Sequence, residues 1–219
     1  MTLKKYDYLL VFDFETTGLS PYLNRIIEVG ALLLKNVGSE FVLEEQLSVL
    51  VRQDQPLDAK ITEITGITDQ MLIKDGISEF EAYQAFRNLM RDRTLLIAYN
   101  ISFDYGFLTN LIRRMTNNND YFVKHDLLDV MAVYKDRHPY PHRLENASKT
   151  YGVFRADAHR ALEDVKMTYD VLAKMQEERD CLIEYVNVIG YNPKYGPSKF
   201  KAPHVTYKPQ DGRRLKLVS

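Results

Sequence analysis

An apolar run near the start of the chain ends in VFDFETTG, residues 11–18. The run predicts a β-strand over residues 7–14, and alternate residues of a strand point to one face. Asp13 and Glu15 are therefore expected to aim at the same point. Two close carboxylates at the end of a hydrophobic strand are costly unless a cation neutralises them. Their oxygen atoms suit a hard divalent ion such as Mg²⁺ or Mn²⁺, which points to metal-assisted phosphoryl chemistry.

An Asp-x-Glu triplet alone is weak, because about one such triplet is expected by chance in a chain this acidic. Two solvated acids at a strand end are the alternative. A third acid, Asp104, follows a strand predicted over residues 94–99. It would lie in the first turn of a helix predicted over 104–116, where the helix dipole favours an anion. Taken alone, Asp104 is equally well an N-terminal helix acid.

A fourth acid lies in DAHRALEDV, residues 157–165. His159 and Asp164 are five residues apart, so a continuous helix would rotate their side chains away from each other. Both reach one site only if His159 precedes the helix and Asp164 projects from it. Asp157 is expected to cap the helix start. A loop histidine that titrates near neutrality is the alternative for His159.

Together, the ordered set of Asp-x-Glu, a later Asp and His-x4-Asp resembles the three motifs of the DEDDh 3′→5′ exonuclease family. Within that family the chain is most similar to proofreading epsilon subunits of bacterial DNA polymerase III. Two further segments resemble the same subfamily, ITEITGITDQML (residues 61–72) and DLLDV (residues 126–130). The resemblance covers residues 6–178. It implies a ribonuclease-H-like fold and hydrolysis of nucleic acid from the 3′ end to nucleoside 5′-monophosphates.

The resemblance also implies roles for five residues. Asp13, Glu15 and Asp164 would hold the tighter of two divalent ions, Mg²⁺ or Mn²⁺, with Asp13 bridging to the second. Asp104 would act on the second ion. His159 would be the general base, and an ordinary histidine pKa of about 6.5 suits that role at neutral pH.

Substrate contacts are carried over position by position from the same resemblance. The positions are Thr16, Thr17, Leu19, Ile64, Thr65, Asn100 and Phe103. Thr65 departs from some proofreading relatives, which have His there. Phe103 matches an aromatic wedge against the penultimate base, and ordinary helix-face packing is the alternative.

The periodicity of apolar residues predicts a mixed α/β sheet with an antiparallel three-strand meander, parallel strands and helices on both faces. Strands are expected over residues 7–14, 25–35, 40–51, 94–99 and 122–126. Helices are expected over residues 57–64, 79–91, 104–116, 128–136, 143–151 and 160–189.

The catalytic domain is predicted to span residues 1–189, followed by a basic tail over residues 190–219. The tail holds seven Lys or Arg and one Asp, a net charge of +6, so residues 1–189 carry −7 of the total of −1. The tail has no helical period and its four prolines break strands, which predicts an extended or disordered segment; it also holds four aromatics. Basic residues interleaved with aromatics suit single-stranded nucleic acid, and they suit a protein partner equally well. The resemblance to epsilon subunits, which use a C-terminal tail to bind the polymerase, implies a DNA polymerase subunit as that partner. A solvated tail without a partner is the third possibility.

The single cysteine, Cys181, excludes an intramolecular disulfide framework and fits a reducing compartment. With no signal peptide or membrane span expected, the sequence predicts a cytoplasmic protein. The leading hypothesis is a proofreading exonuclease that acts on single-stranded DNA or a frayed 3′ end. An exonuclease that trims RNA 3′ ends is the first alternative. An inactive polymerase-binding scaffold is the second, and intact Asp13 and His159 argue against it.

Overall fold

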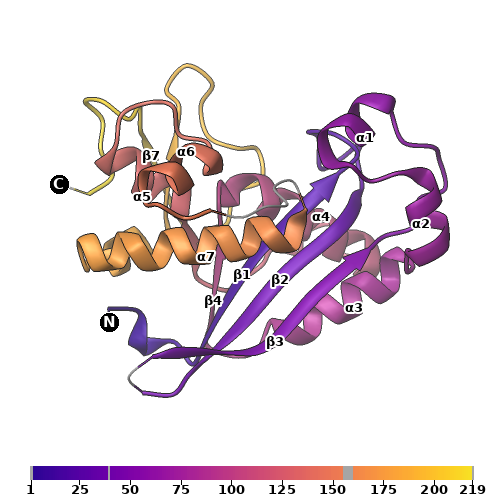
Figure 1. The fold of residues 1–219 in the computed structure, drawn as a ribbon, viewed down its shortest axis with the longest axis horizontal. Coiled ribbons are helices and arrows are strands. Elements are labelled where there is room, and N and C mark those ends of the chain that lie inside the picture. Colours follow the sequence, from indigo (N-terminus) through magenta and orange to yellow (C-terminus); the bar gives the residue numbers. More distant parts are fainter. Residues whose placement is uncertain (1, 39, 155–159, 219) are drawn as a thin grey trace.

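A five-stranded mixed sheet forms the centre of the computed structural model, which describes residues 2–38, 40–154 and 160–218 (Figure 1). The strands are β1 (Tyr8–Thr16), β2 (Ile26–Asn36), β3 (Phe41–Leu50), β4 (Thr94–Ala98) and β5 (Leu127–Asp129), in the order β3-β2-β1-β4-β5. The first three are antiparallel neighbours, and β4 and β5 run parallel to β1. The predicted mixed sheet with a three-strand meander is confirmed.

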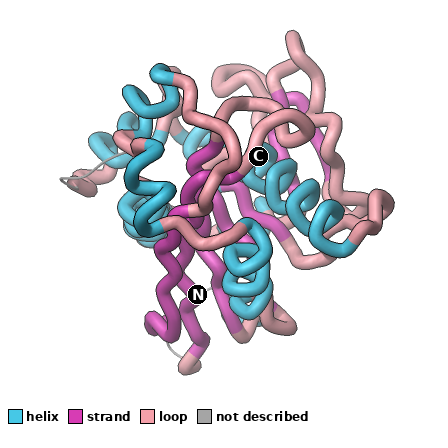
Figure 2. Tube along the Cα trace, turned by 90° about the vertical axis from the view of Figure 1, so that its right-hand side faces the viewer, coloured by secondary structure: helices cyan, strands magenta, loops and turns pink. Residues whose placement is uncertain are grey.

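Helices cover both faces of this sheet (Figure 2). They are α1 (Ala59–Thr65), α2 (Asp69–Asp75), α3 (Glu79–Leu89), α4 (Ile101–Thr116), α5 (Val130–Arg137), α6 (Leu144–Thr150) and α7 (Ala161–Glu178). Short 3₁₀ helices, η1 (Thr2–Lys5) and η2 (Leu182–Tyr185), complete the helical elements. Across the described ranges, none of the helices combines the length and apolarity needed to cross a membrane.

The two faces of β1 belong to two different hydrophobic cores. Its even-numbered residues from Leu10 to Phe14 pack with residues of α3 and α4. Leu9 and Val11 pack with residues of α5 and α7. Because side chains alternate along a strand, Asp13 continues the face of β1 that is directed toward α7.

The connection from β3 to α3 contains two helices where the sequence predicted one. α1 begins after Asp58, whose side chain accepts the backbone N–H of Lys60, and ends at Gly66 with φ of 70°. Thr68 then caps α2 by accepting the backbone N–H of Met71. The two helices pack their apolar residues onto the neighbouring ends of β2 and β3. The capping threonine was the available signal for the second helix.

Two predicted elements are wrong. The short strand predicted over residues 122–126 lies instead at Leu127–Asp129, the part that pairs with β4. The last helix predicted over residues 160–189 ends at Glu178. Beyond it, Cys181, Leu182 and Tyr185 are buried, and the chain turns to bring them into the core beside α5 and α7. A straight continuation of α7 would have left part of this apolar run without a core to enter.

The expectation that residues 190–219 form an extended or disordered tail is also wrong for the described residues. We call residues 187–218 the C-terminal segment. It contains β6 (Val188–Tyr191) and β7 (Thr206–Pro209), which pair in parallel. Its buried apolar residues, Ile189, Phe200, Ala202, Val205 and Leu217, join the two cores. Disorder was predicted from the prolines and the absence of a helical period, but the apolar residues of the segment still reach the two cores.

A buried aspartate on α5 holds the far end of the C-terminal segment. Asp136 is 5% exposed and accepts hydrogen bonds from the Gln210 side chain at 2.6 Å and the backbone N–H of Leu217 at 2.8 Å. The backbone N–H of Val218 donates to the same carboxylate at 3.0 Å, and the Tyr185 hydroxyl at 3.2 Å. The segment is therefore anchored at its end as well as along its length.

Candidate active site

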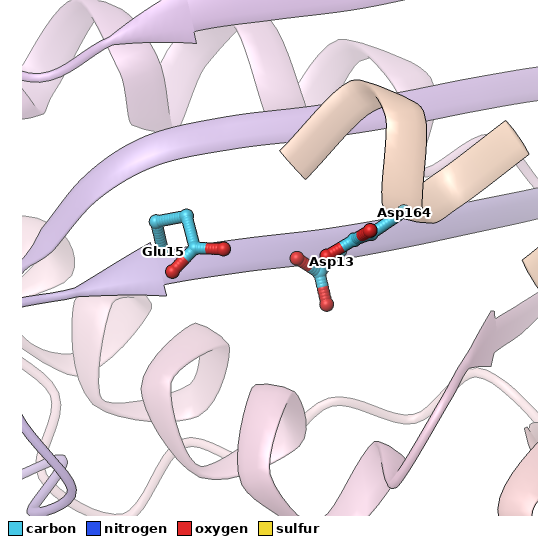
Figure 3. Close-up of side chains that lie close together, drawn as sticks. All are labelled: Asp13, Glu15 and Asp164. Atoms are coloured by element: carbon cyan, nitrogen blue, oxygen red, sulfur yellow. The ribbon is translucent and has the colours of Figure 1, made fainter. Parts of the chain in front are cut away.

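Three carboxylates converge between β1 and α7. Asp13 and Glu15 project from the end of β1, and Asp164 projects from the first turn of α7 toward them (Figure 3). One oxygen atom from each lies within 4.8 Å of the others. The predicted same-face placement of Asp13 and Glu15 is thus found, and α7 supplies the third acid from 149 residues further along the chain than Glu15.

The close approach of α7 to the sheet depends on a glycine. Gly30 lies on β2 directly opposite Asp13 in the β1–β2 register. A Cβ atom at Gly30 would lie 2.4 Å from the carbonyl carbon of Ala161 and 2.5 Å from the backbone nitrogen of Leu162. Both are backbone atoms of the first turn of α7, so only glycine permits this packing. The same turn carries Asp164.

A buried glutamate orients the start of α7, and the sequence analysis did not identify it. Glu28 is 1% exposed and lies opposite Glu15 on β2. One of its oxygens accepts two hydrogen bonds from the Arg160 guanidinium, at 2.7 and 3.0 Å, and the other accepts the backbone N–H of Ala161 at 3.0 Å. Glu28 thus satisfies one of the unpaired donors of the helix N-terminus while it is itself paired.

Asp104 lies beside this cluster but belongs to another element. It is 1% exposed, in the first turn of α4 as predicted, and accepts the backbone N–H of Phe14 at 3.1 Å. This bond places its carboxylate against β1 between Asp13 and Glu15. Asp104 is therefore adjacent to the three convergent carboxylates without being one of them.

The electrostatics of the site favour a bound cation. Burial, followed by the charges of Asp104, Glu15 and Asp164, raises the pKa of Asp13 well above its usual range. Burial, followed by the charge of Asp164, raises the pKa of Glu15 to about 7. Burial also raises the pKa of Asp104, against the hydrogen bond from Phe14. A donor set made only of carboxylate oxygens fits a hard divalent ion, which would offset this repulsion.

The candidate general base is His159. His159 and the expected cap Asp157 lie outside the described residues, and the description resumes at Arg160. α7 begins at Ala161, so His159 precedes the helix in sequence while Asp164 lies on it. The approach of His159 to the site stays a prediction.

The last residue of β1 and the loop after it carry three of the predicted substrate positions. The Thr16 hydroxyl donates to the carbonyl of Gly18 at 2.7 Å, and the Thr17 hydroxyl accepts the backbone N–H of Arg25 at 3.0 Å. These two side chains therefore shape the loop itself. Leu19 is 86% exposed at its tip.

An open groove of about 510 Å³ brings together Leu19 with two positions from α4, Asn100 and Phe103. Asn100 adopts a left-handed conformation with φ of 70° and its backbone N–H donates to Asp129 at 3.0 Å. Phe103 is half-buried with its ring 4.9 Å from that of Phe107, so it both packs on the helix face and lines the groove. The two alternatives for Phe103 are compatible.

The other two predicted substrate positions lie on α1, and they are not among the residues that line this groove. Ile64 is half exposed, while Thr65 is buried. The Thr65 hydroxyl donates to the carbonyl of Ile61 at 2.9 Å and accepts the backbone N–H of Ile67 at 3.1 Å. Its hydroxyl therefore closes the end of α1.

The fold and the acidic cluster define a ribonuclease-H-like nuclease, and comparison with known proteins agrees. The sequence matches the Exonuclease family (RNase_T) over residues 10–172. The chain belongs to this family of 3′→5′ exonucleases, whose members are nucleases and therefore hydrolases.

Relatives in sequence include DNA polymerases. The chain is 34% identical over 180 residues to DNA polymerase III PolC-type of Bacillus subtilis (strain 168). This match covers 80% of this chain and 12% of the polymerase. It is 32% identical over 182 residues to DNA polymerase III PolC-type of Clostridium perfringens, with the same two shares. The chain thus spans about an eighth of the length of these relatives. A nearer likeness to epsilon subunits stays a prediction.

Solved structures show the same fold at lower identity. E. coli Exonuclease I in complex with a dA16 oligonucleotide matches with a TM-score of 0.68 and 23% identity, over 82% of this chain and 42% of that one. Exonuclease I of Methylocaldum szegediense matches with a TM-score of 0.67 and 21% identity, over 81% and 42%. These similarities confirm the predicted ribonuclease-H-like architecture.

Proposed function

We propose that this chain is a metal-dependent 3′→5′ exonuclease that hydrolyses single-stranded DNA or a frayed 3′ end to nucleoside 5′-monophosphates. The observation that carries the proposal is the convergence of Asp13, Glu15 and Asp164 within 4.8 Å, with the buried Asp104 beside them. A structural role alone does not account for such a cluster, because like charges in a buried site destabilise it.

Two divalent ions, Mg²⁺ or Mn²⁺, are the cofactors we propose. Asp13, Glu15 and Asp164 would hold one ion, and Asp104 would act on the second together with Asp13. Bound ions of this kind neutralise phosphate charge and lower the pKa of a bound water. The raised pKa values of Asp13 and Glu15 support this assignment, because a cation would relieve the repulsion that raises them.

The chain's own residues position the reacting groups. The loop from Thr16 to Leu19 and the start of α4 at Asn100 and Phe103 would hold the last nucleotides of the strand, with Ile64 and Thr65 as further proposed contacts. His159 would accept the proton of the attacking water. The new bond joins the water oxygen to phosphorus, and the bond from phosphorus to the 3′ oxygen of the preceding nucleotide breaks. That oxygen then takes up a proton.

DNA is the substrate that the relatives support. The sequence relatives are named as DNA polymerases, and the matched Exonuclease I was solved with a DNA oligonucleotide. Proofreading beside a replicative polymerase follows as the proposed role, with a polymerase subunit as partner through residues 190–219 and a cytoplasmic location. RNA stays the alternative substrate, because among the described residues none is identified as a contact for a 2′-hydroxyl.

A time course with 5′-labelled DNA and RNA of identical sequence tests the proposal, in Mg²⁺, Mn²⁺ and EDTA. We expect a ladder that shortens from the 3′ end, depends on metal, and forms faster on DNA. The Asp13→Asn variant is the matched negative control. Faster shortening of RNA would assign the chain to RNA trimming. No cleavage of either strand would favour the inactive scaffold.

A further inference from the structure

One wall of the groove beside the candidate active site contains none of the substrate positions that the resemblance to exonucleases implied. Two of its sides come from the loop after β1 and from the start of α4, which hold predicted substrate positions. The third side is Ser198, Lys199 and Phe200 of the C-terminal segment. Residues remote in sequence thus complete a groove that already contains Leu19 and Phe103.

Phe200 packs this wall of the groove against Tyr22 and α4. Its side chain is 7% exposed, and its ring lies 4.6 Å from the Tyr22 ring and 5.8 Å from the Arg113 guanidinium of α4. Gly106 of α4 favours the close approach of the loop, because a Cβ there would lie 3.0 Å from the Pro21 side chain, while its distance of 3.5 Å to Phe200 would be an ordinary contact. The side chain of Asn110 also donates to the carbonyl of Pro21. The wall and the loop are therefore fixed on one helix.

The chemistry of the groove suits a single nucleic-acid strand. Among the described residues that line it, Lys199 is the one with a charged side chain. Tyr22 remains 57% exposed while its ring packs on Phe200, and Leu19 is 86% exposed. An aromatic ring with a free face can stack on a base of any sequence, and a lysine can contact the phosphate beside it.

We propose that the C-terminal segment forms a subsite for the nucleotides that precede the 3′ end, in which Lys199 contacts a backbone phosphate and Tyr22, supported by Phe200, stacks on a base. This inference rests on the proposed exonuclease function and extends its substrate site. Position supports it, because Phe103 in the groove directly precedes Asp104, and Leu19 lies four residues after Glu15. Charge supports it as well: the segment is the basic part of a chain whose remainder is acidic, so it attracts a polyanion.

Steady-state kinetics of the full chain in Mg²⁺ test the subsite with two substrates. One is a DNA strand of about 12 nucleotides, and the other is thymidine 5′-monophosphate p-nitrophenyl ester, which has no upstream strand. For Lys199→Glu we expect KM for the strand to rise at least about threefold at low salt, with kcat within about twofold. The matched control is Lys194→Glu, an exposed lysine of the same segment that does not line the groove.

The salt dependence gives an independent measure. The slope of log KM against log salt concentration should fall in magnitude by about 0.7 when one phosphate contact of a single strand is lost. Tyr22→Ala should lower kcat/KM for the strand relative to the ester, and Tyr195→Ala, an exposed tyrosine outside the groove, should not. Circular dichroism confirms that each variant is folded.

These measurements distinguish failure of the subsite from failure of the proposed exonuclease function. If the parent chain hydrolyses both substrates and Lys199→Glu matches Lys194→Glu in KM and in salt slope, the subsite is wrong while the exonuclease stands. If the parent hydrolyses neither the strand nor the ester, the proposed function fails, and the subsite fails with it.

Discussion

At the scale of single residues, Asp13 has the most crowded electrostatic surroundings in the candidate site. Its neighbours include the carboxyl groups of Asp104, Glu15, Asp164 and Glu28, each of which raises its pKa in addition to the effect of burial. The protein thus holds several carboxyl groups together, with the Arg160 guanidinium paired to Glu28. Removal of the Asp13 carboxylate should therefore have opposite effects on two properties. It should raise the stability of the metal-free protein and lower the cleavage activity measured with metal.

Asp13→Asn should therefore stabilise the metal-free protein and abolish cleavage. Loss of the charge removes repulsion, and each 1 kcal/mol gained raises Tm by about 2–4 °C in a domain of this size. Loss of a proposed metal ligand should lower DNA cleavage by more than the roughly 100-fold typical of residues that only support a ligand. Thermal unfolding in EDTA and cleavage in Mg²⁺ measure the two effects. Asp120→Asn, in an exposed loop, is the control, and a lower Tm for Asp13→Asn would contradict the account.

Glu15 makes the stability of the metal-free protein depend on pH. Its pKa is about 7 in the folded protein, above the ordinary value of 4.5. Between these values the folded protein keeps a proton that the unfolded chain has released, so the contribution of Glu15 is full below pH 4.5 and is lost as the pH rises through 7.

Glu15→Gln should remove this dependence. The free energy of unfolding of the variant relative to the parent should increase from about pH 5 to about pH 8, because only the parent becomes charged there. Urea unfolding in EDTA at several pH values measures the difference. A difference that stays constant across this range would show that Glu15 does not titrate as described.

Some residues of the candidate site could be predicted from the sequence, and one could not. The shared direction of Asp13 and Glu15 could be predicted from alternation along a strand, and the place of Asp104 in the first turn of a helix from the apolar pattern around it. Glu28 was missed, although it is an acid inside the apolar run of residues 26–34 and charged residues are seldom buried without a partner. Its partners, Arg160 and the backbone of Ala161, lie more than 130 residues away, and no local pattern identifies them.

At the scale of elements, the site depends on how α7 packs on β2. Gly30→Ala should force the first turn of α7 away from the sheet, because the added carbon would overlap backbone atoms of Ala161 and Leu162. We expect at least a tenfold loss of kcat, since displacement of a catalytic group by about 1 Å can cost 100-fold. Ser48→Ala, at the exposed position opposite Gly30 on β3, is the matched control.

Cleavage assays and thermal unfolding of both variants check this prediction. Unchanged kcat in Gly30→Ala would mean that α7 can shift without moving Asp164. A loss of folding rather than of activity would be visible as a lower Tm, and kcat measured well below that temperature separates the two effects.

The elements themselves divide into those that local patterns determine and those that distant contacts determine. The three long strands and α3 were predicted within about two residues, because the runs and periods of their apolar residues are local signals. In the structure, a capping box at Ser78 starts α3. The end of α7 was not, because the residues from Cys181 to Tyr185 continue an apolar helical pattern. They leave the helix to fill a core whose other residues come from elsewhere in the chain.

At the scale of the whole molecule, Asp136 links the C-terminal segment to the domain. Asp136→Ala would remove the acceptor of the buried Leu217 backbone N–H and of the part-buried Val218 backbone N–H. The buried Gln210 amide would lose one of its two acceptors and keep the Ala132 carbonyl. Each unsatisfied buried group costs about 1–3 kcal/mol, so we expect the free energy of unfolding to fall by about 3 kcal/mol. Hydrogen exchange should speed up most at the amides of β6 and β7.

Urea unfolding and hydrogen exchange test this, with Asp54→Ala, an exposed aspartate, as the control. Equal exchange rates in the parent and Asp136→Ala would show that the segment is held by its apolar contacts alone. Composition could not have predicted this anchor, because it joins a helix and a chain end about 80 residues apart.

The joint between Gly30 and the first turn of α7 has a consequence for which ions can act. Since backbone lies against backbone there, the first turn of α7, which carries Asp164, packs on β2 as closely as only a glycine allows, opposite Asp13. Ca²⁺ takes longer bonds and more ligands than Mg²⁺, and it favours flexible sites. We therefore expect the enzyme to distinguish divalent ions by their radius. The absence of a side chain at Gly30 sets how closely Asp164 approaches Asp13, and so which radii fit.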